Sequence, residues 1–174
     1  MNIEQIRVSH SITESEMAYL GSISREIREW SKHNLLQLIS ADIVFAEPGS
    51  GMVLLRLTDA SLLDFVLEFS GGLLGLAKEP ADFRVGDLEG GFALAVSLQG
   101  DYVSIVEECE HKKSFRVKFR PLLLATGMWV DAVVQDLESR LDALRLNKEY
   151  VKLRPELLKV AGELKGSTEV EGAK

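Results

Sequence analysis

The chain has 174 residues, and its 46% hydrophobic and 27% charged residues are typical of one globular domain and not of a disordered chain. Asp and Glu number 27 against 20 Lys and Arg, which gives a formal net charge of −7. Proteins that coat nucleic acids or bind anionic membranes carry surplus positive charge, so this balance argues against both classes.

The cysteine content and the first residues predict a cytoplasmic protein. Cys109 is the only cysteine, so no disulfide can form within the chain, which fits a reducing compartment. The opening MNIEQIRVSH carries Glu4 where a secretory signal has positive charge, and it contains no long apolar stretch. The most apolar segments, 62–77 and 121–130, are respectively too charged and too short to cross a bilayer. We therefore expect neither export nor a membrane span.

Hydrophobic periodicity assigns the first elements. Apolar residues alternate with polar ones over 6–12, which predicts a strand. Thr13 and Glu16 have the spacing of a capping box, and the apolar stripe that follows predicts one helix to about Lys32. Two strands joined by a Pro- and Gly-containing turn are expected within 35–57.

The most apolar helix is expected next, with Thr58 or Asp59 as its cap. Its apolar residues between Leu62 and Leu74 cover more than one face, so we expect it to lie in the centre of the fold. The glycines within 71–75 are expected to weaken its end.

The second half of the chain predicts a hairpin, a third strand and further helices. Residues 92–98 and 102–109 read as antiparallel strands joined at Gln99-Gly100-Asp101, and 115–120 as the next strand. Pro121 is expected to start a long helix, whose apolar stripe Val130–Leu144 packs across the sheet or forms a dimer seam. Pro155 is expected to open a short last helix.

These elements predict an α+β fold with a single domain over 1–165 and a flexible tail over 166–174. The domain is expected to contain a mainly antiparallel sheet of about five to six strands, packed against two or three helices, with a long C-terminal helix.

The titratable residues form no strong catalytic or metal-binding pattern. Cys109 and His111 could supply a nucleophile with its base or part of a metal site, but a structural zinc site usually needs four Cys or His ligands. His10 is expected to be a hydrogen-bonded side chain on a strand, and His33 to lie at the end of the first helix. The glycine cluster at 71–75 lacks the Lys-Ser/Thr pair of a phosphate-binding loop. We therefore expect no catalytic, cofactor-binding or metal-binding residues.

Charged residues gather around the predicted hairpin. The basic cluster Lys112–Arg120 is interpreted either as a binding face or as cross-strand partners of the nearby glutamates. Partner-binding anchors are predicted on the acidic turns and beside them, at Asp101, Tyr102, Glu107, Glu108 and Glu110.

The segments FAEPGSG, LLDFVLEFSGGLLGL, GGFALAVSLQGDYVSIVEE and VKFRPLLLATGMWVDAVVQDLESRL follow one another in an order that resembles small bacterial proteins. These include immunity proteins of polymorphic toxin systems. The resemblance covers roughly Ile39–Leu144 and implies neutralisation of a cognate toxin in the cytosol by one-to-one docking. It assigns no site residue.

The sequence thus predicts a non-catalytic protein-binding protein, with an immunity protein that meets a basic toxin domain as the specific hypothesis. The alternatives are a small enzyme that uses Cys109, His111 or His10, and a homodimeric adaptor or structural protein. A protein partner is expected, without nucleic acid or membrane, and the protein itself is expected to be a monomer or a homodimer.

Overall fold

The strands of the protein form two sheets. The computed structural model describes residues 2–87, 91–109 and 112–167. The five-stranded sheet has the order β1 (Asn2–Ile3), β8 (Ser114–Lys118), β7 (Tyr102–Glu107), β6 (Phe92–Gln99) and β5 (Phe83–Asp87). The three-stranded sheet has the order β2 (Arg7–Ser11), β3 (Ser40–Ala46) and β4 (Val53–Ser61). All neighbours are antiparallel except β1 and β8, which are parallel.

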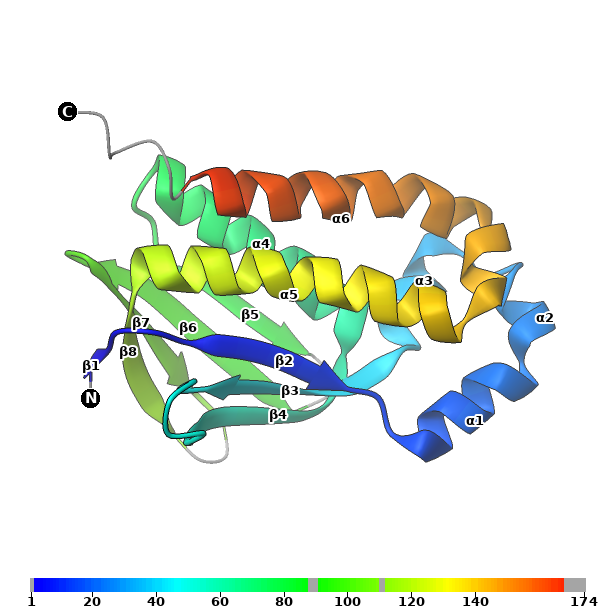
Figure 1. Ribbon diagram of the computed structural model, residues 1–174, viewed down its shortest axis with the longest axis horizontal. Helices are drawn as coiled ribbons and strands as arrows, with labels where there is room; N and C mark the ends of the chain where they lie inside the picture. The colour runs from blue at the N-terminus through cyan, green and yellow to red at the C-terminus, as the bar shows by residue number, and fades with distance from the viewer. Residues whose placement is uncertain (1, 88–90, 110–111, 168–174) are drawn as a thin grey trace.

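One segment near the N-terminus connects the two sheets. Its first part, β1, pairs with β8 in the larger sheet, and β2 then pairs with β3 in the smaller one. Figure 1 shows this segment running beneath the long helices from one sheet to the other.

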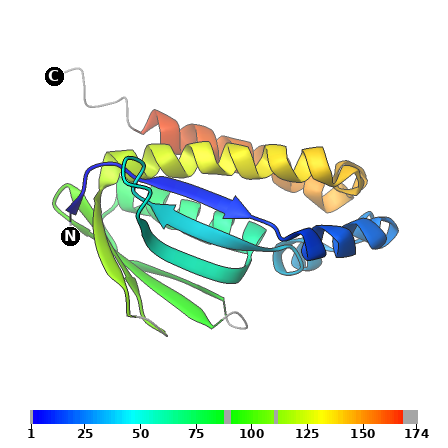
Figure 2. The same cartoon turned by 60° about the horizontal axis from the view of Figure 1, so that its bottom comes forward.

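The helices lie largely on one side of the sheets (Figure 2). In chain order they are α1 (Glu14–Ser22), α2 (Ser24–Ile27), α3 (Lys32–Gln37), α4 (Leu62–Lys78), α5 (Phe119–Arg140), the 3₁₀ helix η1 (Asp142–Leu146) and α6 (Lys148–Gly166). Within the described part of the chain, no helix has the length and apolar character that crossing a bilayer requires. The α+β class, the mainly antiparallel pairing and the long C-terminal helix are confirmed. The division into two sheets was not predicted.

Helix α4 lies in the centre of the core, as its apolar residues predict. Phe65 and Phe69 stack with ring centroids 5.3 Å apart. Phe65 also contacts Phe92 of β6 at 5.8 Å and Trp129 of α5 at 6.0 Å, while Phe69 contacts Phe45 of β3 at 5.5 Å. These contacts join both sheets to the helices. Each ring removed from water contributes about 1.5–3 kcal/mol to the stability of the fold.

Helices α5 and α6 pack closely at Gly127. A Cβ on this residue would lie 2.9 Å from the Ala161 carbonyl oxygen, so only glycine permits this approach. Ion pairs flank the contact: Lys165 Nζ lies 2.5 Å from an Asp131 carboxylate oxygen, and Arg154 lies 2.5 Å from Glu138. The apolar stripe at 130–137 is buried against this core, so it is not available as a dimer seam.

The first predicted helix is divided into shorter pieces. Helix α1 ends at Ser22, α2 at Ile27, and α3 begins after Ser31, instead of one helix to Lys32. The break after α2 has a tertiary reason: the buried Asn147 amide donates to the carbonyls of Ile27 and Trp30, at 2.7 and 2.9 Å, which a continuous helix would use internally. His33 therefore lies in the first turn of α3 and not at a carbonyl end.

Other boundaries also differ from the predicted ones: β8 ends at Lys118, and α5 begins at Phe119, two residues before Pro121. Strand β4 continues through Thr58 and Asp59, and Leu62 begins α4 with its amide bonded to the Ile39 carbonyl at 2.8 Å. The glycines at 71–75 lie inside α4, which continues to Lys78. Pro155 lies inside α6 and does not open it. Helix α6 begins at Lys148, because the Asn147 side chain caps it by accepting from two backbone amides. The predicted tail falls mostly on 168–174, outside the described residues.

Candidate functional site on the outer face of the five-stranded sheet

The predicted acidic anchors lie at opposite ends of β7. Asp101 and Tyr102 stand at its beginning, and Glu107 and Glu108 at its end. Five residues of extended strand separate the two groups by about 17 Å. The anchors therefore do not form one patch, and Glu110 lies outside the described residues.

The side chain of Glu107 points toward the core, unlike those of the other described anchors. Its 5% exposure places it on the buried face of β7 with Val103 and Ile105. The alternation of the strand already carried this signal, because 103, 105 and 107 have the same parity. Glu107 thus offers almost no surface to a partner.

Two charged pairs connect neighbouring parts of this sheet, and whether the cluster Lys112–Arg120 pairs with the glutamates or forms a binding face stays a prediction. Glu108 accepts from Arg84 of β5 at 3.2 Å, and Lys118 of β8 pairs with Glu4, which follows β1. Lys118 reaches Glu4 because β1 is the parallel neighbour of β8 in this sheet. Sequence reasoning missed Arg84 and Glu4. Glu4 could not be found because β1 pairs with a strand 114 residues away in the chain, which leaves no local pattern.

Tyr102 is held in place by a row of side chains across β7, β8 and β1. Its hydroxyl donates to a Glu4 carboxylate oxygen at 2.9 Å, and the Arg116 guanidinium lies 5.5 Å from its ring centroid. The hydrogen bond from Lys118 is the main reason that the pKa of Glu4 is lowered. The hydrogen bond to Glu4 raises the pKa of Tyr102, and the same carboxylate raises the pKa of Lys118.

Between these edges the sheet presents small side chains to solvent. We call the face turned away from α4 the outer face; its central positions are Ala93, Ala95, Ser97, Ser104 and Val106. The strand register places Ala95 beside Val106, and Ser97 beside Ser104. The residues of opposite parity, such as Leu94 and Ile105, are buried in the core.

The small residues leave a shallow depression of about 490 Å³ over Ala95, Ser97 and Val106, bordered by Asp82 and Arg84. Exposed faces of antiparallel sheets ordinarily present polar side chains to water. Here a rigid surface of low relief lies between Tyr102 with its neighbours on one side and the Arg84–Glu108 pair on the other. Its chemistry suits contact with another surface.

No family model matches the chain, and no curated protein or solved structure was found to match it. The resemblance to immunity proteins therefore stays a prediction.

His10 and Cys109 lie apart in the fold. His10 Nε2 and an Asp136 carboxylate oxygen are 3.1 Å apart, and the His10 side chain is 8% exposed, which confirms a hydrogen-bonded strand residue. Cys109 is exposed after β7, on the other sheet, and His111 lies outside the described residues. Among the residues that the structure describes, no three Cys, His, Asp or Glu gather in a group that could hold a metal ion.

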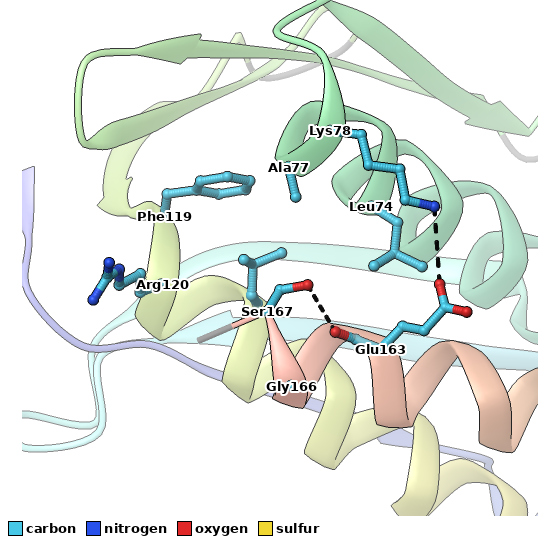
Figure 3. A pocket seen from close by; sticks show the side chains of 9 residues that line it. Leu74, Ala77, Lys78, Phe119, Arg120, Glu163, Gly166 and Ser167 are labelled. Atoms are coloured by element: carbon cyan, nitrogen blue, oxygen red, sulfur yellow. Dashed lines mark hydrogen bonds and ion pairs between the residues drawn. The ribbon is translucent and has the colours of Figure 1, made fainter. Parts of the chain in front are cut away.

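A second hollow lies where the ends of three helices meet (Figure 3). It has a volume of about 710 Å³ and is lined mainly by α4, α5 and α6. Lys78 and Glu163, which point toward each other in Figure 3, are 4.0 Å apart, and Ser167 donates to the Glu163 carbonyl at 2.8 Å. The carbonyl ends of α4 and α6 and the Glu163 carboxylate border this hollow opposite Arg120 in the first turn of α5, so its charges are mixed and do not select an anion. The outer face is therefore the stronger candidate.

Proposed function

We propose that the protein is a non-catalytic protein-binding protein whose binding surface is the outer face of the five-stranded sheet. The observation that carries this proposal is the set of small residues in the middle of that face. Ordering a Lys, Arg or Glu side chain at an interface costs about 1.5–2 kcal/mol of conformational entropy, whereas Ala costs none. A partner that docks over Ala95, Ser97 and Ser104 meets a surface that is already ordered.

The edges of the outer face provide the anchors. Tyrosine and arginine are enriched among the residues that dominate binding energy in protein interfaces. Tyr102 keeps one orientation through Glu4 and Arg116, so little of its freedom remains to be lost on binding. Arg84 of β5 and Glu108, which follows β7, supply a charged pair that spans β6.

An immunity protein is the specific role that we propose within this class. The net charge of −7 would accelerate association with a basic toxin domain. Asp101 and Glu108 are exposed at the two ends of β7 and border the outer face, so they can meet basic residues of such a partner.

The test compares two serine substitutions that differ only in their place. Ser104→Arg puts a long side chain in the middle of the outer face. Ser9→Arg does the same on β2 of the other sheet, where the serine is likewise half-buried. Affinity capture from cells of the source organism is expected to retain a partner with the wild type and Ser9→Arg and to lose it with Ser104→Arg.

With the partner purified, Ser104→Arg is expected to raise the dissociation constant at least tenfold, which corresponds to about 1.4 kcal/mol. Equal binding by Ser104→Arg and the wild type, with both variants folded, would contradict the proposal. For the immunity role, co-expression must also restore growth of cells that produce the toxin domain, and failure to do so removes that role only.

A further inference from the structure

Arg116 is the basic residue of the outer face that has no anionic partner among the described residues. Arg84 and Lys118, the other basic residues on the strands of this sheet, each pair with a glutamate. Within the described part of the chain, the guanidinium of Arg116 makes no hydrogen bond or ion pair, and it contacts only the face of the Tyr102 ring as a charged group. A half-buried arginine without an anion is therefore part of the proposed binding surface.

The strand register places Arg116 in a row of polar side chains that crosses the sheet. Arg116 of β8 lies opposite Ser104 of β7, and Ser104 lies opposite Ser97 of β6. Directly opposite residues of antiparallel strands share one face, with Cβ atoms about 4.5–5.5 Å apart. We call Arg116, Ser104 and Ser97 the polar row. Each of its members supplies hydrogen-bond donors, and none supplies negative charge.

The contact with Tyr102 holds the guanidinium in one orientation. The central carbon of the guanidinium lies 5.5 Å from the ring centroid, and Tyr102 is itself fixed by its hydrogen bond to Glu4. Arg116 Nε is buried without a partner, whereas the two Nη groups are not buried. Their N–H groups form a fork that matches the two oxygens of one carboxylate. This donor group is ordered before a partner arrives, which lowers the entropy cost of binding.

We propose that a carboxylate side chain of the protein partner binds Arg116 together with the neighbouring Ser104 hydroxyl. This inference rests on the proposed function, because the contact lies within the outer face. A partner that covers Arg116 without supplying an anion removes water from the Nη groups and leaves their donors unpaired, which weakens association. One aspartate or glutamate side chain satisfies both Nη groups, and the Ser104 hydroxyl can donate to the same carboxylate.

The charge of the chain favours a single carboxylate over a nucleic acid. Phosphate oxygens also bind guanidinium groups, but the affinity of proteins for nucleic acids depends on many basic contacts. Arg116 is one cation, and the net charge of −7 opposes a polyanion. A basic protein domain still carries individual acidic side chains, and one of them at Arg116 would fix how the two surfaces are aligned.

The first test compares two arginine variants that change the net charge equally. Arg116→Gln removes the guanidinium from the polar row, whereas Arg56→Gln removes one from β4 of the other sheet. Because both lower the net charge by one, they alter long-range attraction alike. Binding is measured with the purified protein that the wild type retains. Arg116→Gln is expected to raise the dissociation constant at least about tenfold, and Arg56→Gln to change it less than about twofold.

The second test locates the carboxylate on the partner. Carbodiimide coupling of glycine ethyl ester labels accessible carboxylates, and one aspartate or glutamate of the partner is expected to be protected in the complex. Its replacement by the corresponding amide should weaken binding to the wild type at least about tenfold and have little further effect on binding to Arg116→Gln. Such non-additivity in a double-mutant cycle identifies a direct pair.

Melting temperatures establish first that each variant is folded. If Arg116→Gln is not folded, Arg116→Lys takes its place in both tests, because lysine keeps the charge but lacks the fork and is also expected to weaken binding.

The outcomes separate this inference from the proposed function. If Ser104→Arg abolishes binding while Arg116→Gln and Arg56→Gln bind equally, the outer face is the binding surface and the carboxylate contact is wrong. Multiplying effects of Arg116→Gln and the partner substitution would also refute the contact, and loss of binding after nuclease treatment would assign Arg116 to a phosphate instead. If Ser104→Arg binds like the wild type, the proposed function fails, and this inference fails with it.

Discussion

Replacing Gly127 by alanine tests the packing of α5 on α6. A Cβ at this position would lie 2.9 Å from the Ala161 carbonyl oxygen, 2.8 Å from Lys165 Cγ and 3.3 Å from Leu164 Cβ. The first of these atoms belongs to the backbone of α6, and the Lys165 side chain is held by Asp131. The helices must therefore separate, and overpacking of this kind costs about 1–3 kcal/mol.

The matched control is Gly162→Ala, on the facing helix. A Cβ there has no heavy atom within 4 Å. Both substitutions gain about 1 kcal/mol of helix propensity, so Gly162→Ala should stabilise the protein by about that amount. The two variants should then differ by about 1–3 kcal/mol in their free energy of unfolding, and Gly127→Ala should be the less stable.

Urea unfolding of both variants and the wild type measures this difference, provided that each transition is two-state. If Gly127→Ala raised the midpoint as much as Gly162→Ala, the helices would not approach each other as the structure describes, and the reasoning would be wrong.

Three further predictions concern single side chains. Asn147→Ala removes four hydrogen bonds of a buried amide and should lower the free energy of unfolding by about 3 kcal/mol in the same urea assay; a loss below about 1 kcal/mol would contradict its role. Burial raises the pKa of Tyr150 above its ordinary value near 10. The folded state therefore holds this proton more tightly, and stability falls as the pH rises above about 10; Tyr150→Phe should decline less over that range, and equal slopes would refute this. Glu4→Gln should lower the pKa of Tyr102 in an absorbance titration at high pH, because the carboxylate raises it, and an unchanged titration would show that the pair is not formed.

Patterns within one element predicted most of the fold. The alternation at 6–12 and 92–98 identified two strands, and the apolar circumference of 62–74 identified the central helix. Gly100, at φ 63°, occupies the left-handed conformation that the turn between β6 and β7 requires. In each case the residues that carry the signal are neighbours in the chain.

Contacts between distant residues account for the failures. Asn147 divides the first helix by taking the carbonyls of Ile27 and Trp30, which lie about 120 residues away in the chain. A backbone hydrogen bond to Ile39 sets the start of α4 in the same way. Propensity and capping patterns describe only local competition, so they placed these boundaries wrongly.

The candidate site was predictable only in part. Asp101 was correctly placed at a turn and Tyr102 at the start of the next strand, and Glu108 is exposed as expected. Strand parity could have excluded Glu107. The outer face itself depends on which side of the sheet the helices cover, and that is set by contacts between residues far apart in the chain.

The most direct test of the binding role is hydroxyl-radical labelling of the tyrosines in the purified complex. Tyr102 lies at the edge of the outer face, whereas Tyr19, which is 55% exposed on α1, lies on an element outside the five-stranded sheet. The account predicts that the partner protects Tyr102 from labelling and leaves Tyr19 unchanged. Protection of Tyr19 with unaltered labelling of Tyr102 would contradict it.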